Sequence, residues 1–94
     1  MIITKKVTFI AKEDHIAQLK HLLTEMVDAS RREVGCLKYD IFQIEDNLKK
    51  FIVIESWENE DALEGHKNSS HYKHYKAHYK PFTADKYSNN LNIL

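Results

Sequence analysis

The sequence predicts an α+β domain in which helices cover one face of a four-stranded antiparallel sheet. Two observations lead to this fold class. Apolar residues recur with a period of two in four stretches and at helical spacing between them, in the order strand, helix, strand, strand, helix, strand. The chain has 94 residues, so a single domain over 1–94 is expected. The order β-α-β-β-α-β is that of the ferredoxin-like split βαβ fold.

The first half of the chain supplies a strand and a long helix. Residues 2–10 are rich in β-branched side chains that alternate between two faces, which predicts a strand. Apolar residues over 14–34 recur at helical spacing, with charged residues between them. Asp14 is the expected N-cap of this helix and Gly35 its expected stop.

A hairpin is expected next. Residues 36–45 and 50–58 both alternate as strands do, and Asp46 and Asn47 lie between them as turn residues. Two strands joined by so few residues must pair antiparallel. The tail over 83–94 ends in apolar residues and weakly predicts a final strand.

Two further helices are expected between the hairpin and the tail. Asn59 is a favourable N-cap, and Gly65 is expected to end the short helix that follows it. Ser69 or Ser70 starts the next helix, which stops before Pro81.

The stretch HYKHYKAHYK at 71–80 repeats His-Tyr-Lys three times. On a helix this repeat places the tyrosines on one face, the lysines on a second and the histidines on a flank between them. A buried aromatic face and a solvated basic face explain the pattern. No cysteine joins the histidines and no HExxH motif is present, so no metal site is expected.

The strand that reads FIVIESW is apolar on both faces. Helices can cover only one face of the sheet, and a chain this short has nothing left for the other. We therefore expect a homodimer in which two sheets pack face to face.

Composition excludes several classes of partner. Lys and Arg together number 14, as do Asp and Glu, so the formal net charge is zero and neither nucleic acid nor a membrane surface is an expected partner. The single cysteine, Cys36, cannot form an internal disulfide. The N-terminus lacks a signal-peptide core, and no apolar run approaches the ~20 residues of a membrane span, so a cytoplasmic protein is expected.

A few polar and aromatic residues are candidates for chemistry. Glu55 shares an apolar strand face with Trp57, so it is either held in a structural hydrogen bond or ion pair, or it is a pocket acid that moves a proton. His66 follows Gly65 where the chain should fold back over that strand, so it either caps a helix or acts as a base. Trp57 and Tyr39 are either core residues or the walls of an aromatic pocket.

Three blocks of sequence carry a resemblance to a known family. E-V-G-C-L-K-Y-D at 33–40, F-I-V-I-E-S-W at 51–57 and E-D-A-L-E-G-H-K-N-S-S-H at 60–71 resemble the antibiotic biosynthesis monooxygenase domain. The resemblance covers nearly the whole chain and implies a dimeric ferredoxin-like α+β barrel with a pocket in each subunit. It also implies a small oxygenase that acts on quinols or polycyclic phenols without a cofactor, with molecular oxygen as co-substrate.

Site residues follow from the resemblance by position. His66 and Glu55 would be catalytic, with His66 as the base and Glu55 orienting it or sharing its proton. The resemblance implies Trp57, Tyr39 and His71 as substrate-binding residues, and Tyr72, from the tyrosine face of the His-Tyr-Lys helix, is expected to join them.

Two other functions stay open. Residues 66–73 and 39–43 also resemble the enzymes that isomerise phosphorylated autoinducer-2, a linear phospho-sugar dione, with Lys67 as a candidate phosphate ligand. A non-catalytic, dimeric small-ligand-binding protein is the third possibility. Haem-degrading relatives fit poorly, because their pattern has Trp in place of His66 and His in place of Lys76.

Overall fold

The computed structural model describes all 94 residues and confirms the ferredoxin-like α+β fold. One antiparallel sheet has the strand order β2-β3-β1-β4. The elements in chain order are β1 (Ile3–Ala11), a 3₁₀ turn (Glu13–His15), α1 (Ile16–Thr24), α2 (Met26–Arg31), β2 (Cys36–Ile44), β3 (Asn47–Trp57), α3 (Glu60–Lys67), α4 (Ser70–His78), a second 3₁₀ turn (Lys80–Phe82) and β4 (Thr83–Leu91).

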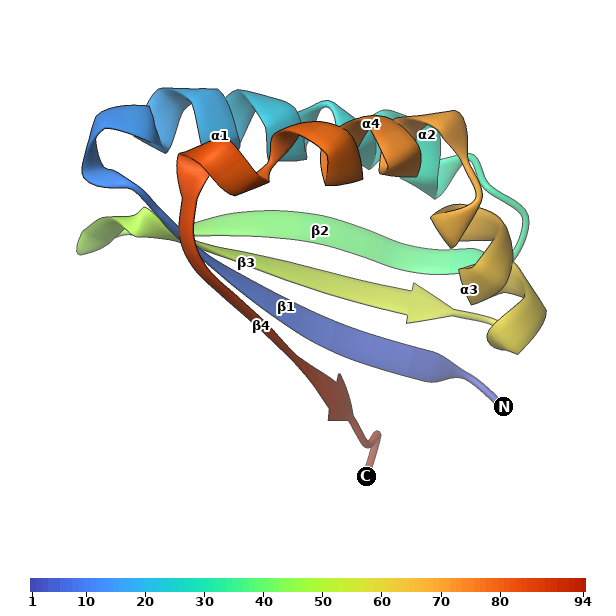
Figure 1. The fold of residues 1–94 in the computed structure, drawn as a ribbon. Helices are drawn as coiled ribbons and strands as arrows, with labels where there is room; N and C mark the ends of the chain where they lie inside the picture. Colours follow the sequence, from blue (N-terminus) through green and yellow to red (C-terminus); the bar gives the residue numbers. More distant parts are fainter.

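The helices all lie on one face of the sheet, and the opposite face carries no helix (Figure 1). On β3, residues Phe51, Val53, Glu55 and Trp57 are buried beneath the helices, as the alternation predicts. On the opposite face the exposed aromatic and aliphatic side chains include Phe42, Tyr87 and Leu91. None of the helices has the length and apolar character needed to span a lipid bilayer.

The predicted long helix is in fact two helices. Asp14 lies inside the 3₁₀ turn that precedes α1, and the start of α1 has no side-chain cap, so the predicted N-cap is wrong. The helix breaks after Thr24, whose hydroxyl donates to the carbonyls of Lys20 and His21 at 2.9 and 3.0 Å. A threonine that bonds back to the preceding turn competes with the helical ladder and bends the helix.

Two predicted helix starts are confirmed and one predicted stop is wrong. The Asn59 side chain accepts a hydrogen bond from the Ala62 amide at 2.9 Å, and Ser69 Oγ accepts one from the Tyr72 amide at 3.2 Å. Gly65 does not end α3, which continues to Lys67, because its backbone stays in the right-handed region. The hairpin turn lies at residues 45–46, one residue earlier than expected.

The aromatic face of the His-Tyr-Lys repeat is confirmed. Tyr75 is buried, and Tyr72 and Tyr79 are half-buried and pack against the core. His74 and His78 are exposed, and His78 Nδ1 donates to the His74 carbonyl oxygen at 2.7 Å. The repeat therefore docks α4 on the sheet, and its tyrosines form one wall of the interior.

Candidate functional site

A cavity of about 90 Å³ lies between the sheet and the helices. Its lining is mainly apolar and aromatic: Val7, Phe9, Leu23, Met26, Tyr39, Val53, Leu63, Tyr72 and Tyr75. The charged and polar residues of the lining are Lys5, Glu55, His66, Lys67, Lys86 and Ser88. An apolar cavity with a few convergent polar groups is the usual form of a small-molecule site.

His66 is the most buried polar side chain of this lining, with 2% of its surface exposed. Helix α3 places it there, since the buried Leu63 lies three residues earlier on the same helix face. Its ring stacks against Trp57 at 4.5 Å between centroids and meets the edge of Tyr72 at 5.1 Å. These contacts fix the orientation of the imidazole.

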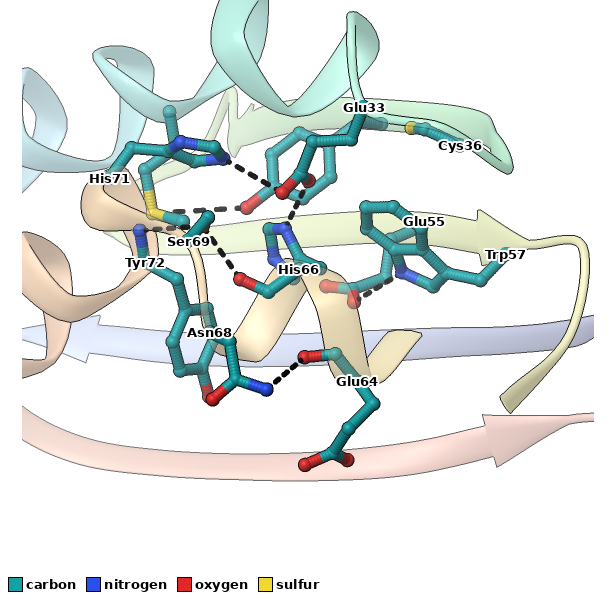
Figure 2. A network of polar contacts seen from close by, with 12 residues as sticks. Glu33, Cys36, Glu55, Trp57, Glu64, His66, Asn68, Ser69, His71 and Tyr72 are labelled. Carbon is teal, nitrogen blue, oxygen red and sulfur yellow. Dashed lines mark hydrogen bonds and ion pairs between the residues drawn. The ribbon is translucent and has the colours of Figure 1, made fainter. Parts of the chain in front are cut away.

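Glu33 is the hydrogen-bond partner of His66. Its Oε2 lies 2.6 Å from His66 Nδ1, and its Oε1 lies 3.4 Å from His71 Nε2 (Figure 2). The three residues come from the loop after α2, from α3 and from the first turn of α4. Sequence reasoning missed Glu33, although it is the first residue of the E-V-G-C block.

Glu55 was expected to orient His66, but its hydrogen-bond partner is Trp57. Its Oε1 accepts a hydrogen bond from Trp57 Nε1 at 2.9 Å, and both side chains are buried (Figure 2). Glu55 lines the cavity, whereas Trp57 is fully buried behind His66 and does not. The carboxylate that holds His66 is therefore Glu33, and Glu55 holds the indole on which the imidazole stacks.

The four expected substrate-binding residues divide into two pairs. Tyr39 and Tyr72 line the cavity, where a ligand could reach them. Trp57 and His71 do not line it, and each instead contacts the His66–Glu33 pair, Trp57 through its ring and His71 through Glu33. In this geometry they position His66.

The tyrosines of the cavity are neutral hydrogen-bond donors. Burial raises the pKa of Tyr39, Tyr72 and Tyr75 above the ordinary value of tyrosine, and the negative charge of Glu55 adds to this effect. The Tyr39 hydroxyl donates to Met26 Sδ at 4.0 Å. None of the three is therefore charged near neutral pH.

Glu33, His66 and His71 are the residues that could hold a metal ion. One potential ligand atom of each lies within 4.8 Å of those of the other two. Two ligands of a tetrahedral zinc ion are roughly 3.4 Å apart. The 2.6 Å between Glu33 Oε2 and His66 Nδ1 is shorter than this, so these two residues are joined by a short hydrogen bond. The 3.4 Å between Glu33 Oε1 and His71 Nε2 matches the spacing of two zinc ligands.

Comparisons with known proteins agree with this fold. The sequence profile of the antibiotic biosynthesis monooxygenase family matches residues 2–78. Rv0793 of Mycobacterium tuberculosis, whose name marks it as a candidate monooxygenase, is 32% identical over 69 residues, which cover 73% of this chain and 67% of the relative. The structure of Rv0793 has a TM-score of 0.93 at 25% identity and covers 100% of this chain and 96% of its own.

PA3566 from Pseudomonas aeruginosa is similar over the same length. Its crystal structure has a TM-score of 0.95 at 30% identity and covers 99% of this chain and 94% of its own. Residues 2–78, which the family profile matches, include the three sequence blocks around the cavity and the Glu33–His66 pair. By profile, sequence and structure, the chain belongs to the antibiotic biosynthesis monooxygenase family.

Proposed function

We propose that this protein is a cofactor-independent monooxygenase that oxidises a small phenol or quinol in the cavity beneath α3 and α4, with His66 as the base. The observation that carries the proposal is the 2.6 Å contact between His66 Nδ1 and Glu33 at the wall of an aromatic cavity. Membership of the monooxygenase family supports it at the level of reaction class.

The Glu33 contact prepares His66 to accept a proton. A carboxylate can only accept a hydrogen bond, so the proton of a neutral His66 lies on Nδ1. Nε2 then carries a free lone pair, and the negative charge of Glu33 stabilises the imidazolium that forms when Nε2 takes a proton. A ring hydroxyl of the substrate is the proton donor in this scheme.

The remaining steps use only the substrate and molecular oxygen. The deprotonated ring passes one electron to O₂, and the two radicals combine so that a ring carbon forms a bond to oxygen. The peroxide anion that results takes back the proton held on His66 Nε2, which gives a hydroperoxide and restores the base. The hydroperoxide then loses the ring hydrogen as a proton and its outer oxygen as hydroxide, which leaves a carbonyl and water. One oxygen atom enters the product and the other enters water. The apolar and aromatic part of the lining limits the contact of bulk water with the radical pair.

The size of the cavity favours a single aromatic ring over the polycyclic phenols that the resemblance also allows. An enclosed cavity of about 150 Å³ is known to hold benzene. The cavity here is about 90 Å³ and is open to solvent on one side, so it favours no more than one ring.

Oxygen consumption tests the proposal directly. The purified, metal-stripped protein is expected to consume O₂ with single-ring hydroquinones and phenols faster than the autoxidation blank. With ¹⁸O₂, one labelled atom should appear in the quinone product for each turnover. Uptake that yields only hydrogen peroxide, with no label in the organic product, would contradict a monooxygenase.

A second candidate function rests on one observation. Lys5, Lys67 and Lys86 all line the cavity, and ammonium groups bind phosphate. A phosphorylated linear dione isomerised by the protein without oxygen would favour this function. Binding of either compound class with no turnover would indicate a ligand-binding protein.

We also propose that two copies pair through the open face of the sheet. Ile52 is at the centre of this face, and Phe42, Tyr87 and Leu91 lie around it, from 39% to 50% exposed. A stable interface buries about 800 Å² on each partner, which a sheet face can supply.

Light scattering after size exclusion should give a mass near twice 11.1 kDa. Phe42→Glu should shift this protein to the monomer, because a charge would be buried in the interface. Val34→Glu is the matched control, since Val34 is 92% exposed in a loop away from the sheet face. A wild-type monomer at micromolar concentration would contradict the pairing.

A further inference from the structure

Lys86 on β4 ends inside a cluster of aromatic rings. Its Nζ lies 4.9 Å from the centroid of Tyr79, 5.4 Å from that of Tyr75 and 5.7 Å from that of Phe9. Aromatic faces attract a cation at these distances and hold it in place. Lys86 also lines the cavity, as do Phe9 and Tyr75. The ammonium group is thus held at the cavity wall.

The charge of Lys86 has no counter-ion within the protein. Lys86 takes part in none of the ion pairs of the structure. Burial lowers its pKa to about 8, and the positive charges of Lys76 and Lys5 act in the same direction, whereas Glu55 opposes them. The group is still mostly protonated at pH 7, so a half-buried cation faces the cavity without a partner.

The charges around the cavity favour an anion. Lys5, Lys67 and Lys86 line it, and Glu55 is the one acidic residue of the lining. Glu55 already accepts a hydrogen bond from Trp57. A cavity with this excess of positive charge binds an anionic ligand in preference to a neutral one of the same shape.

Lys86 and His66 lie at different ends of the cavity. In the sheet register Lys86 pairs with Phe9, whereas Glu55, which bonds the indole that contacts His66, pairs with Lys5, four residues along β1, or roughly 13 Å. The rings of Tyr72 and Tyr75 connect the two ends, since Tyr72 is 5.1 Å from His66 and 5.5 Å from Tyr75. A ligand ring along this tyrosine wall would present one substituent to each end.

We propose that Lys86 binds an anionic substituent of the substrate, so that the substrate is an aromatic hydroxy acid whose hydroxyl faces His66 and whose carboxylate faces Lys86. The His66 end of this assignment rests on the proposed function. The Lys86 end is a statement about binding and is testable without turnover.

Binding under anaerobic conditions is the experiment. The probes are 2,5-dihydroxybenzoate and its neutral counterpart 2,5-dihydroxybenzamide, titrated by calorimetry at pH 7. The wild-type protein is expected to bind the acid at least about tenfold more tightly than the amide. Lys86→Met keeps the length and packing of the side chain and should abolish that preference. Lys76→Met is the matched control: Lys76 lies 5.6 Å from the Tyr79 ring but does not line the cavity, so the preference should remain.

The pH profile separates a binding role from a structural one. Only the protonated amine attracts the carboxylate, so the preference should fall as pH rises through about 8. Lys86→Arg should extend it beyond pH 9, because the guanidinium stays charged. The other charged groups around Lys86 are Lys5, Lys76 and Glu55, none of which is replaced in this variant.

Three results would overturn the proposal. The first is equal affinity for the acid and the amide, and the second is a preference for the acid that survives Lys86→Met in a folded protein. The third is Lys86-dependent binding of dihydroxyacetone phosphate that is tighter than the binding of either ring compound. The last would assign the lysine to an aliphatic phosphate. Failure of the proposed function is a separate result: a protein that keeps the Lys86-dependent preference but consumes no oxygen would lose the monooxygenase assignment alone.

Discussion

Replacing Glu33 with glutamine is expected to lower the rate of substrate oxidation by about 10²–10⁴-fold while the protein stays folded. The amide has the shape of the carboxylate but lacks its charge, and its NH₂ group can donate to His66 Nδ1. That donation moves the imidazole proton to Nε2, where the base needs a lone pair. Oxygen-uptake rates at saturating substrate, with the melting temperature of each variant, measure the effect.

Glu64→Gln is the matched control for this change, because Glu64 is exposed on α3 and its side chain has no polar partner. It should leave both the rate and the melting temperature unchanged. His66→Gln should be at least as damaging as Glu33→Gln, and the double variant should be no slower than His66→Gln alone, since the two residues act as one unit. A Glu33→Gln protein with wild-type turnover would reduce the pair to a structural contact.

The parts of the fold that follow local rules were predictable from the sequence. Period-two alternation placed Phe51, Val53 and Glu55 on the covered face of β3 because strand side chains must alternate. The Asn59 and Ser69 caps follow from the need to satisfy free amides at a helix start.

The site was only partly predictable, because its contacts join distant segments. His66 was identified, but its partner Glu33 is 33 residues away in a loop, where no periodicity indicates the direction of a side chain. Glu55 and Trp57 were expected on one face, yet alternation cannot show that they bond to each other. Lys86 was missed because its strand was the most weakly predicted, so its face could not be assigned.

A substitution that disturbs both fold and site is Gly35→Ala. Gly35 has a φ of +80°, which is in the left-handed region that L side chains avoid. A Cβ atom there would also lie 2.5 Å from the Cβ of Ala62 on α3. Strain and overpacking together are expected to destabilise the protein by roughly 2–4 kcal/mol. For a domain of this size, the melting temperature should fall by roughly 10–25 °C.

Gly65→Ala is the matched control within the same structure. Gly65 lies inside α3 with right-handed backbone angles, and a Cβ atom there would meet nothing within 4 Å. Alanine should therefore stabilise the helix by ~0.5–1 kcal/mol and raise the melting temperature by a few degrees.

Oxygen uptake should distinguish these glycines as well. The contact at Gly35 sets the distance between α3 and the loop that carries Glu33, so a displaced α3 would pull His66 away from its carboxylate partner. Gly35→Ala should then slow turnover even at temperatures where the variant is fully folded, whereas Gly65→Ala should not. Full activity in folded Gly35→Ala protein would mean that the His66–Glu33 distance tolerates movement of the helix, and that the base is held by Trp57 and Tyr72 more than by the packing of α3.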